Sequence, residues 1–183
     1  NMLKVTSDGK KLALDPRCYV PTSEDEEGSK LNACAQNIFE IWEDTKGFKG
    51  TQIVFCDLST PKVRFENYTY GTDFDAYNDL KFKLVQMGIP KEQIAFIHEA
   101  STDEQKQALF DRVNAGDVRV LIGSTEKCGA GTNVQKRLGA LHHLDTPYRP
   151  SDMEQREGRI IRQGNTNEKV QIFTYVTERT FDS

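Results

Sequence analysis

The sequence has few of the residues that build metal sites, disulfide frameworks or membrane spans. Its 183 residues include four cysteines and three histidines. The cysteines are widely separated and form no CxxC pair, which argues against a zinc site and a disulfide framework and favours buried intracellular thiols. His142 and His143 are adjacent, so in a strand they would face opposite ways and could not chelate one metal together. No metal site is therefore expected.

No apolar run approaches the roughly 20 residues that a membrane-spanning helix needs, and no signal peptide precedes the first strand candidates. These absences predict a cytoplasmic protein without a membrane partner. The unusual start at Asn1 and Met2 leads us to expect a piece of a longer chain.

Composition and charge describe an ordinary globular domain with 37% hydrophobic and 28% charged residues. The net charge of −4 does not point to nucleic acid, although residues 120–165 carry seven Lys/Arg against five Asp/Glu. An acidic run at residues 23–27 is typical of a solvated linker. We therefore expect an irregular arm or linker at residues 1–29. Residues 30–183 are long enough for one hydrophobic core, so we expect them to form one domain.

Strand and helix patterns alternate along that domain. Helical spacing of apolar residues appears at 30–45, at 75–87 and after a capping box at Ser101 and Glu104, with Ala108, Leu109 and Val113 facing inward. Short apolar runs predict strands at residues 51–57, 94–97, 118–124, 139–145 and 170–176. The alternation predicts an α/β fold with a doubly wound, mainly parallel sheet and helices on both faces.

In such a sheet the working loops lie at the carboxyl ends of the strands. We therefore expect one rim to carry four segments, namely Asp57 onward, His98-Glu99, 124–133 and 145–150. The loop at 124–133 contains Gly-Ala-Gly and leads into a predicted short helix, so its backbone could approach a phosphate. The side chains of Ser124, Thr125 and Lys127 would suit a nucleic-acid phosphate, although a simple tight turn is an open alternative.

The segment SDMEQREGRIIRQGN at residues 151–165 predicts a helix that begins with a capping box of Ser151 and Glu154. Gln155, Arg159 and Arg162 are spaced by four and three residues, so they share one helical face. Two guanidiniums one turn apart suit a polyphosphate or carboxylates. The alternative is a solvated basic helix whose arginines pair with neighbouring acidic residues of the same segment.

The sequence contains no GxxxxGK followed by Ser or Thr. Without that loop, no lysine reaches the β- and γ-phosphates and no hydroxyl holds magnesium. This chain cannot therefore assemble a complete ATPase centre alone, but it could supply an arginine from a second lobe.

Several segments occur in an order that resembles the second RecA-like lobe of superfamily-two helicases. They are IVFCD, IHEASTDEQKQALF, VLIGSTEKCGAGTNVQ, LHHLDTPYRP and QREGRIIRQGN. The likeness covers about residues 30–176 and is closest to Swi/Snf-type translocases. The sequence around STEK and GTNVQ is most similar to the helicase portion of large methylase–helicase proteins of phages and mobile elements. This similarity implies a bacterial or phage origin.

The resemblance implies an ATP-dependent DNA helicase or translocase whose ATP and Mg²⁺ are bound mainly by an N-terminal RecA-like lobe of the same parent chain. It implies that Arg162 is the arginine finger and Arg159 its companion. It further implies two sets of contacts, to ATP at Gln155, Gly131 and Asn133 and to nucleic acid at Ser124, Thr125 and Lys127.

Two other functions remain open. A helicase-like lobe could serve as a scaffold that binds DNA without hydrolysing ATP, as part of a DNA methylase-type protein. An unrelated doubly wound enzyme, such as a methyltransferase, would need a Gly-rich loop near the first strand, and the order of the segments does not fit that requirement.

Overall fold

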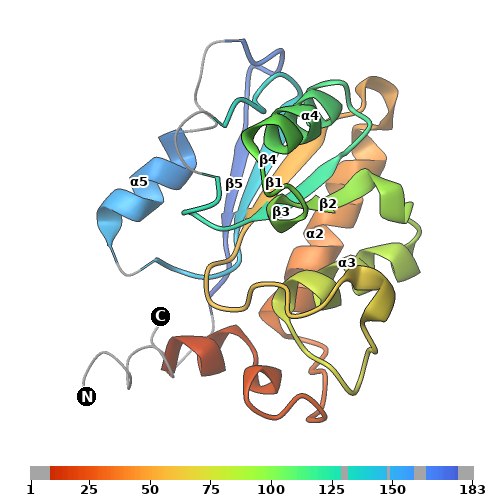
Figure 1. Cartoon of the computed structure of the whole chain (residues 1–183), viewed down its shortest axis with the longest axis vertical. Coiled ribbons are helices and arrows are strands. Elements are labelled where there is room, and N and C mark those ends of the chain that lie inside the picture. Colours follow the sequence, from red (N-terminus) through yellow and green to blue (C-terminus); the bar gives the residue numbers. More distant parts are fainter. Residues whose placement is uncertain (1–8, 129–131, 148, 159–163, 177–183) are drawn as a thin grey trace.

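The structure, a computed structural model, describes residues 9–128, 132–147, 149–158 and 164–176. Its centre is a sheet of five strands in the order β2-β3-β1-β4-β5 (Figure 1). All four strand pairs are parallel. The strands are β1 (Thr51–Phe55), β2 (Ile94–Phe96), β3 (Val120–Gly123), β4 (Leu138–His143) and β5 (Gln171–Thr174). The five predicted strands and the parallel α/β sheet are confirmed.

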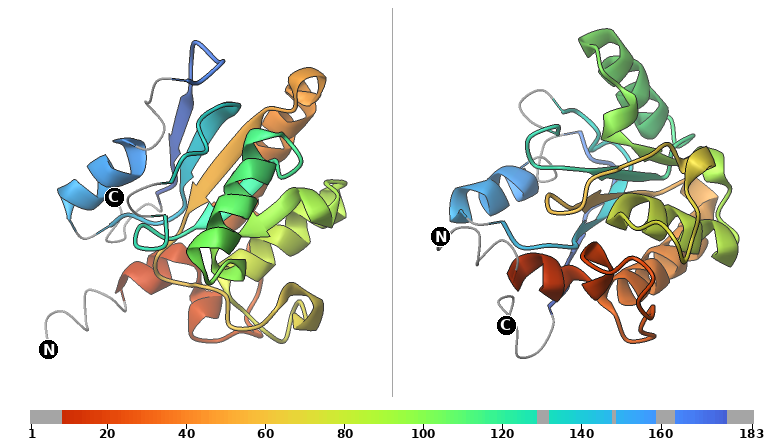
Figure 2. Two further views of the ribbon diagram at one scale, coloured as in Figure 1. Left: turned by 45° about the horizontal axis from the view of Figure 1, so that its top comes forward. Right: turned by 60° about the horizontal axis from the view of Figure 1, so that its bottom comes forward.

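Helices cover both faces of this sheet (Figure 2). One face packs against α2 (Lys30–Asp44) and α3 (Ala76–Met87), and the other packs against α4 (Asp103–Asn114). The last helix, α5 (Pro150–Gly158), lies beside the carboxyl ends of the strands. Short 3-10 helices occupy Pro16–Cys18, Lys46–Phe48, Phe65–Asn67, Lys91–Gln93 and Ile97–Glu99.

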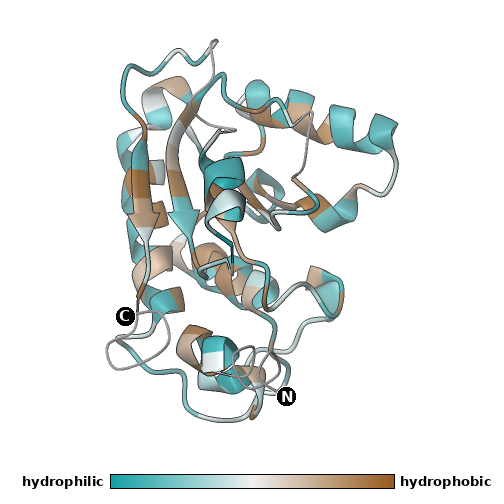
Figure 3. Cartoon of the chain, turned by 90° about the vertical axis from the view of Figure 1, so that its left-hand side faces the viewer, coloured by the Kyte–Doolittle hydropathy of each residue, from teal (hydrophilic) through white to brown (hydrophobic). Residues whose placement is uncertain are grey.

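Alternation along the strands divides the core into two layers. Val54 packs with the α2 and α3 side, whereas its neighbours Ile53 and Phe55 pack with the α4 side. Successive side chains of a strand point to opposite faces, so a sheet covered on both sides buries the residues of both faces. Figure 3 shows hydrophobic stretches on the strands and many hydrophilic residues on the helices.

The amino end of α4 corrects one detail of the sequence prediction. The capping box is formed by Thr102 and Gln105, not by Ser101 and Glu104. The helix begins one residue later than predicted. Leu109 and Val113 face inward as predicted, whereas Ala108 is exposed and Phe110 is the third buried residue.

The segment expected to be an irregular arm has helical turns at residues 9–14 and at Pro16–Cys18. Leu14 is part of the core on the α2 side, and buried Arg17 forms ion pairs with Asp15 and Asp79. Asp25 pairs with Lys83 of α3, so the solvated-linker interpretation is wrong at this position. None of the described helices is long and apolar enough to cross a membrane.

Candidate functional site

A cavity of about 580 Å³ lies at the carboxyl ends of the strands. Its walls come from the segments that follow β1, β2 and β3 and from α5. The lining residues are Asp57, Thr60, His98, Ser124, Thr125, Glu126, Lys127, Asp152 and Gln155. Segments that are far apart in the sequence therefore share one rim, as the parallel sheet predicted.

The loop after β3 is held in a tight turn. The N–H of Cys128 donates to the carbonyl of Ser124 at 2.9 Å, and the N–H of Lys127 donates to the Ser124 hydroxyl at 3.1 Å. Gly123 is required at the end of the strand, since a Cβ there would lie 2.4 Å from the sulfur of Cys128. The predicted short helix is wrong for the described part of this loop, where residues 125–128 form a turn and residues 132–135 have no regular structure.

The helix α5 begins one residue earlier than predicted. Pro150 is its first residue, so Ser151 lies inside the helix and cannot be its N-cap. Proline suits a first helical position because its fixed φ is already helical and its missing N–H has no partner to lose there. Gln155 is exposed and faces the cavity, as the helix prediction requires.

Arg156 is the residue that sequence reasoning missed. Its side chain is 1% exposed, and its Nη2 lies 2.8 Å from a carboxylate oxygen of Asp145 and 2.9 Å from one of Asp57. Its Nε donates to the hydroxyl of Thr125 at 2.8 Å, and its Nη1 donates to the carbonyl of Asp145 at 2.9 Å. One guanidinium thus joins α5 to the loops after β1, β3 and β4.

The two aspartates also fix the loop backbone around Arg156. Asp145 accepts from the N–H groups of Asp57 and Leu58 at 2.7 and 2.8 Å. Asp57 accepts from the N–H of Thr125 at 2.7 Å and from its hydroxyl at 2.8 Å. The sequence contains a signal for this cluster of Arg156 and two aspartates, because each aspartate follows a predicted strand. Nothing in the sequence indicates which arginine of α5 pairs with them.

Electrostatics at the rim favour a charged arginine beside neutral histidines. Burial lowers the pKa of Arg156, but the charges of Asp145 and Asp57 outweigh it and raise the pKa overall. Burial, followed by the charge of Arg156, lowers the pKa of His143, and hydrogen bonding to Glu157 opposes this shift. Burial and the charge of Lys127 lower the pKa of His98. Both imidazoles are therefore neutral at pH 7.

The structure brings together four of the predicted site residues. Ser124, Thr125, Lys127 and Gln155 line the cavity. Asn133 is exposed and does not line it, and its carbonyl accepts from Asn114 at 2.7 Å. The remaining three, Gly131, Arg159 and Arg162, lie outside the described residues. The roles of all eight remain predictions.

The described lining carries three carboxylates, of which Asp57 is neutralised by Arg156, and one cation, Lys127. Within the described residues, no group of three or more His, Cys, Asp or Glu could hold a metal ion. Hydroxyls, an amide and one ammonium can bind a single phosphate, but they do not make a complete site for ATP and Mg²⁺.

Comparison with known proteins identifies the family. The helicase conserved C-terminal domain matches residues 34–164. A comparison with curated proteins gave no match. The C-terminal part of the Fun30 ATPase domain superposes with a TM-score of 0.64 and 19% identity, covering 91% of this chain and 50% of that chain.

Two further structures share the fold. The DUF1998 helicase MrfA, bound to DNA, gives a TM-score of 0.51 with 16% identity and covers 78% of this chain and 18% of its own. Dbp5 of S. cerevisiae, bound to RNA and ADP BeF3, gives 0.50 with 20% identity and covers 79% and 33%. The chain thus spans at most half the length of these structures. With its parallel sheet and its family match, the chain belongs to the family of helicase conserved C-terminal domains.

Proposed function

We propose that this chain is the C-terminal motor lobe of an ATP-dependent DNA helicase or translocase. One observation carries the proposal, namely that Arg156 ties α5 to Thr125 and to Asp57. The helix that leads toward Arg159 and Arg162 is therefore joined to the loop that carries the proposed nucleic-acid contacts. A force on one element is transmitted to the other, which is what a motor lobe must do.

In the proposed mechanism, Ser124 and Lys127 hold the backbone of one strand. Thr125 fixes the loop that carries them, because its N–H and its hydroxyl both donate to Asp57 and are therefore not available to a phosphate. Gln155 and the segment after it face the nucleotide, with Arg162 as the arginine finger and Arg159 as its companion. An arginine so placed stabilises the charge that develops on the transferring phosphoryl group.

ATP and Mg²⁺ are bound mainly by an N-terminal RecA-like lobe in this proposal, because the sequence lacks the GxxxxGK loop. The choice of DNA over RNA, the Swi/Snf-like subtype, the link to phage methylase–helicase proteins and a cytoplasmic location rest on the sequence resemblance. Of the structural neighbours, MrfA is bound to DNA and Dbp5 is bound to RNA.

Arg162→Ala in a protein that contains both lobes tests the proposal. Nucleic-acid-stimulated ATP hydrolysis is expected to fall by about 10³-fold or more, the scale of an arginine finger. Arg112→Ala, an exposed arginine of α4, is the matched control and should leave turnover unchanged. The 183-residue chain alone should show negligible hydrolysis. Near-normal turnover of Arg162→Ala would rule out the assignment.

The alternative is a scaffold that binds DNA without hydrolysis. It predicts that the two-lobe protein binds DNA with equal affinity with and without ATP and releases no phosphate. Nucleic-acid-stimulated phosphate release would eliminate it.

A further inference from the structure

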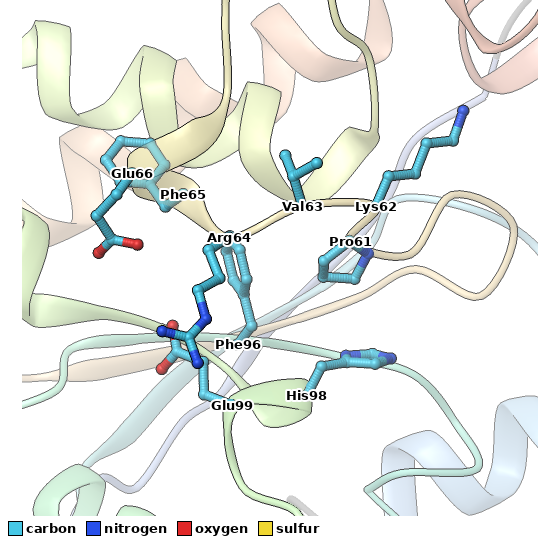
Figure 4. Close-up of a pocket in the computed structure, with 9 residues that line it drawn as sticks. All are labelled: Pro61, Lys62, Val63, Arg64, Phe65, Glu66, Phe96, His98 and Glu99. Atoms are coloured by element: carbon cyan, nitrogen blue, oxygen red, sulfur yellow. The ribbon is translucent and has the colours of Figure 1, made fainter.

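A second cavity, of about 510 Å³, adjoins the functional site. It is lined by residues 61–66 of the loop after β1, together with Phe96, His98 and Glu99 (Figure 4). His98 also lines the functional cavity, so the two cavities share one residue of their walls. The second cavity is therefore a neighbour of the functional site.

The loop that forms this cavity is held by α3. The N–H of Lys62 donates to Asp75 at 3.1 Å, and the amide of Asn78 donates to the carbonyl of Val63 at 2.9 Å. The ammonium of Lys81 lies 4.7 Å from the ring centroid of Phe65. Asp75, Asn78 and Lys81 are themselves buried. The walls are therefore formed before a ligand arrives, which reduces the entropy lost on binding.

The chemistry of the lining favours a planar, uncharged ring. Phe65 and Phe96 provide aromatic surface, and Pro61 adds an apolar wall. Two cations, Lys62 and Arg64, are matched by two carboxylates, Glu66 and Glu99, so the interior does not favour a polyanion. Figure 4 shows the side chain of Arg64 extending toward Glu99.

The cations are available at the edge of this cavity. Lys62 and Arg64 are both exposed, and within the described part of the chain neither forms an ion pair. Arginine can bind a phosphate with two parallel hydrogen bonds or stack on a base. His98, which is neutral at pH 7, contributes an aromatic ring to the wall that the two cavities share and no positive charge.

We propose that this cavity receives a base of the single strand whose backbone lies along Ser124 and Lys127. The base stacks against Phe65, and its flanking phosphate contacts Arg64. The inference rests on the proposed function for the identity of the strand, and it adds a base contact made by the loop after β1.

Photo-crosslinking locates the base directly. The 183-residue chain is irradiated with a single-stranded DNA 12-mer that contains 5-iodouracil, and the crosslinked peptides are sequenced. Crosslinks within residues 61–66 or 96–99 are expected, together with crosslinks at 124–127. Crosslinks confined to 124–127 would overturn the base pocket and leave the proposed function standing. Crosslinks at neither segment would overturn both.

Binding of the same oligonucleotide separates a stacking contact from general attraction. Phe65→Leu keeps an apolar side chain but removes the ring, so affinity should fall by about fivefold or more, the lower end for a lost base stack. Phe65→Trp should retain the affinity of the unchanged chain. Equal affinities for Phe65→Leu and the unchanged chain would overturn the proposal, as long as circular dichroism shows the variant folded.

Salt dependence tests the phosphate contact. Arg64→Ala should reduce the slope of log affinity against log salt by about 0.7, the value for one phosphate of a single strand. Lys91→Ala is the matched control, because Lys91 is exposed and precedes the amino end of β2, whereas the cavity lies at the carboxyl end of that strand. Equal slopes for Arg64→Ala and Lys91→Ala would remove Arg64 from the site.

Discussion

Two buried arginines, Arg17 and Arg156, have similar surroundings but hold different parts of the molecule together. Arg17 forms ion pairs with three aspartates and Arg156 with two. Each guanidinium lies over a phenylalanine ring, 4.6 Å from its centroid at Arg17 and 5.3 Å at Arg156. Neither arginine is more than 3% exposed, so burial alone does not distinguish the two clusters.

The difference lies in what each arginine anchors. Arg17 joins the N-terminal segment to Asp79 of α3, and neither residue lines the functional cavity. Arg156 contacts Asp57 and Thr125, and both of these line it. A buried ion pair therefore marks a site only where its partners face a cavity, because structural pairs shift pKa values in the same way.

The largest effect on stability is expected from Arg156→Met. The substitution leaves the carboxylates of Asp57 and Asp145 without their cation, so the free energy of unfolding should fall by about 3–5 kcal/mol. Urea unfolding measures the change, and Arg149→Met, at an exposed position, should stay within about 0.5 kcal/mol of the unchanged chain. At temperatures where the variant is folded, its affinity for single-stranded DNA should also fall. Unchanged affinity would break the link between Arg156 and the site.

Arg17→Met should cost less, about 3 kcal/mol, at the lower end for a broken buried pair. Lys83 compensates in part, because its ammonium lies 3.2 Å from Asp79 and also pairs with Asp25. The same urea titration measures the loss. DNA affinity of the folded variant should be unchanged, and a loss comparable to that of Arg156→Met would show that the two clusters are not functionally distinct.

The smallest expected effect is on the pH dependence of the free energy of unfolding, through His143 on the Arg156 side of the molecule. Because the pKa of His143 is lowered in the folded state, its contribution to stability is present above the unfolded value of about 6.5 and is lost as pH falls toward the folded value. The slope contributed by one proton is at most about 1.4 kcal/mol per pH unit. His143→Gln should therefore flatten the curve of unfolding free energy below about pH 6.5.

His142, whose pKa burial lowers to about 3, titrates in both proteins and serves as an internal reference. Parallel curves for the two proteins would show that His143 does not titrate as its surroundings predict.

The strands and most helices could be predicted because their signals are local. The run from Thr51 to Phe55 is rich in apolar and β-branched residues, which favours a strand, and a loop follows it. The boundary of α4 failed by one residue, since Ser101 and Thr102 offer equally good caps. The start of α5 was misplaced because Pro150, which suits a first helical position, begins the helix before Ser151. Asp25 was misjudged for another reason, because its partner Lys83 is 58 residues away.

The sequence by itself determined the parallel α/β sheet, the rim that carries its working loops and the placement of Ser124, Thr125 and Lys127 on that rim. Only the tertiary structure decided that Arg156 is the buried member of α5. Asp57 and Asp145 are 88 residues apart and become neighbours because β1 and β4 pair in parallel. Periodicity reports which residues share a helical face, but which face is buried depends on distant carboxylates that only the folded sheet brings together.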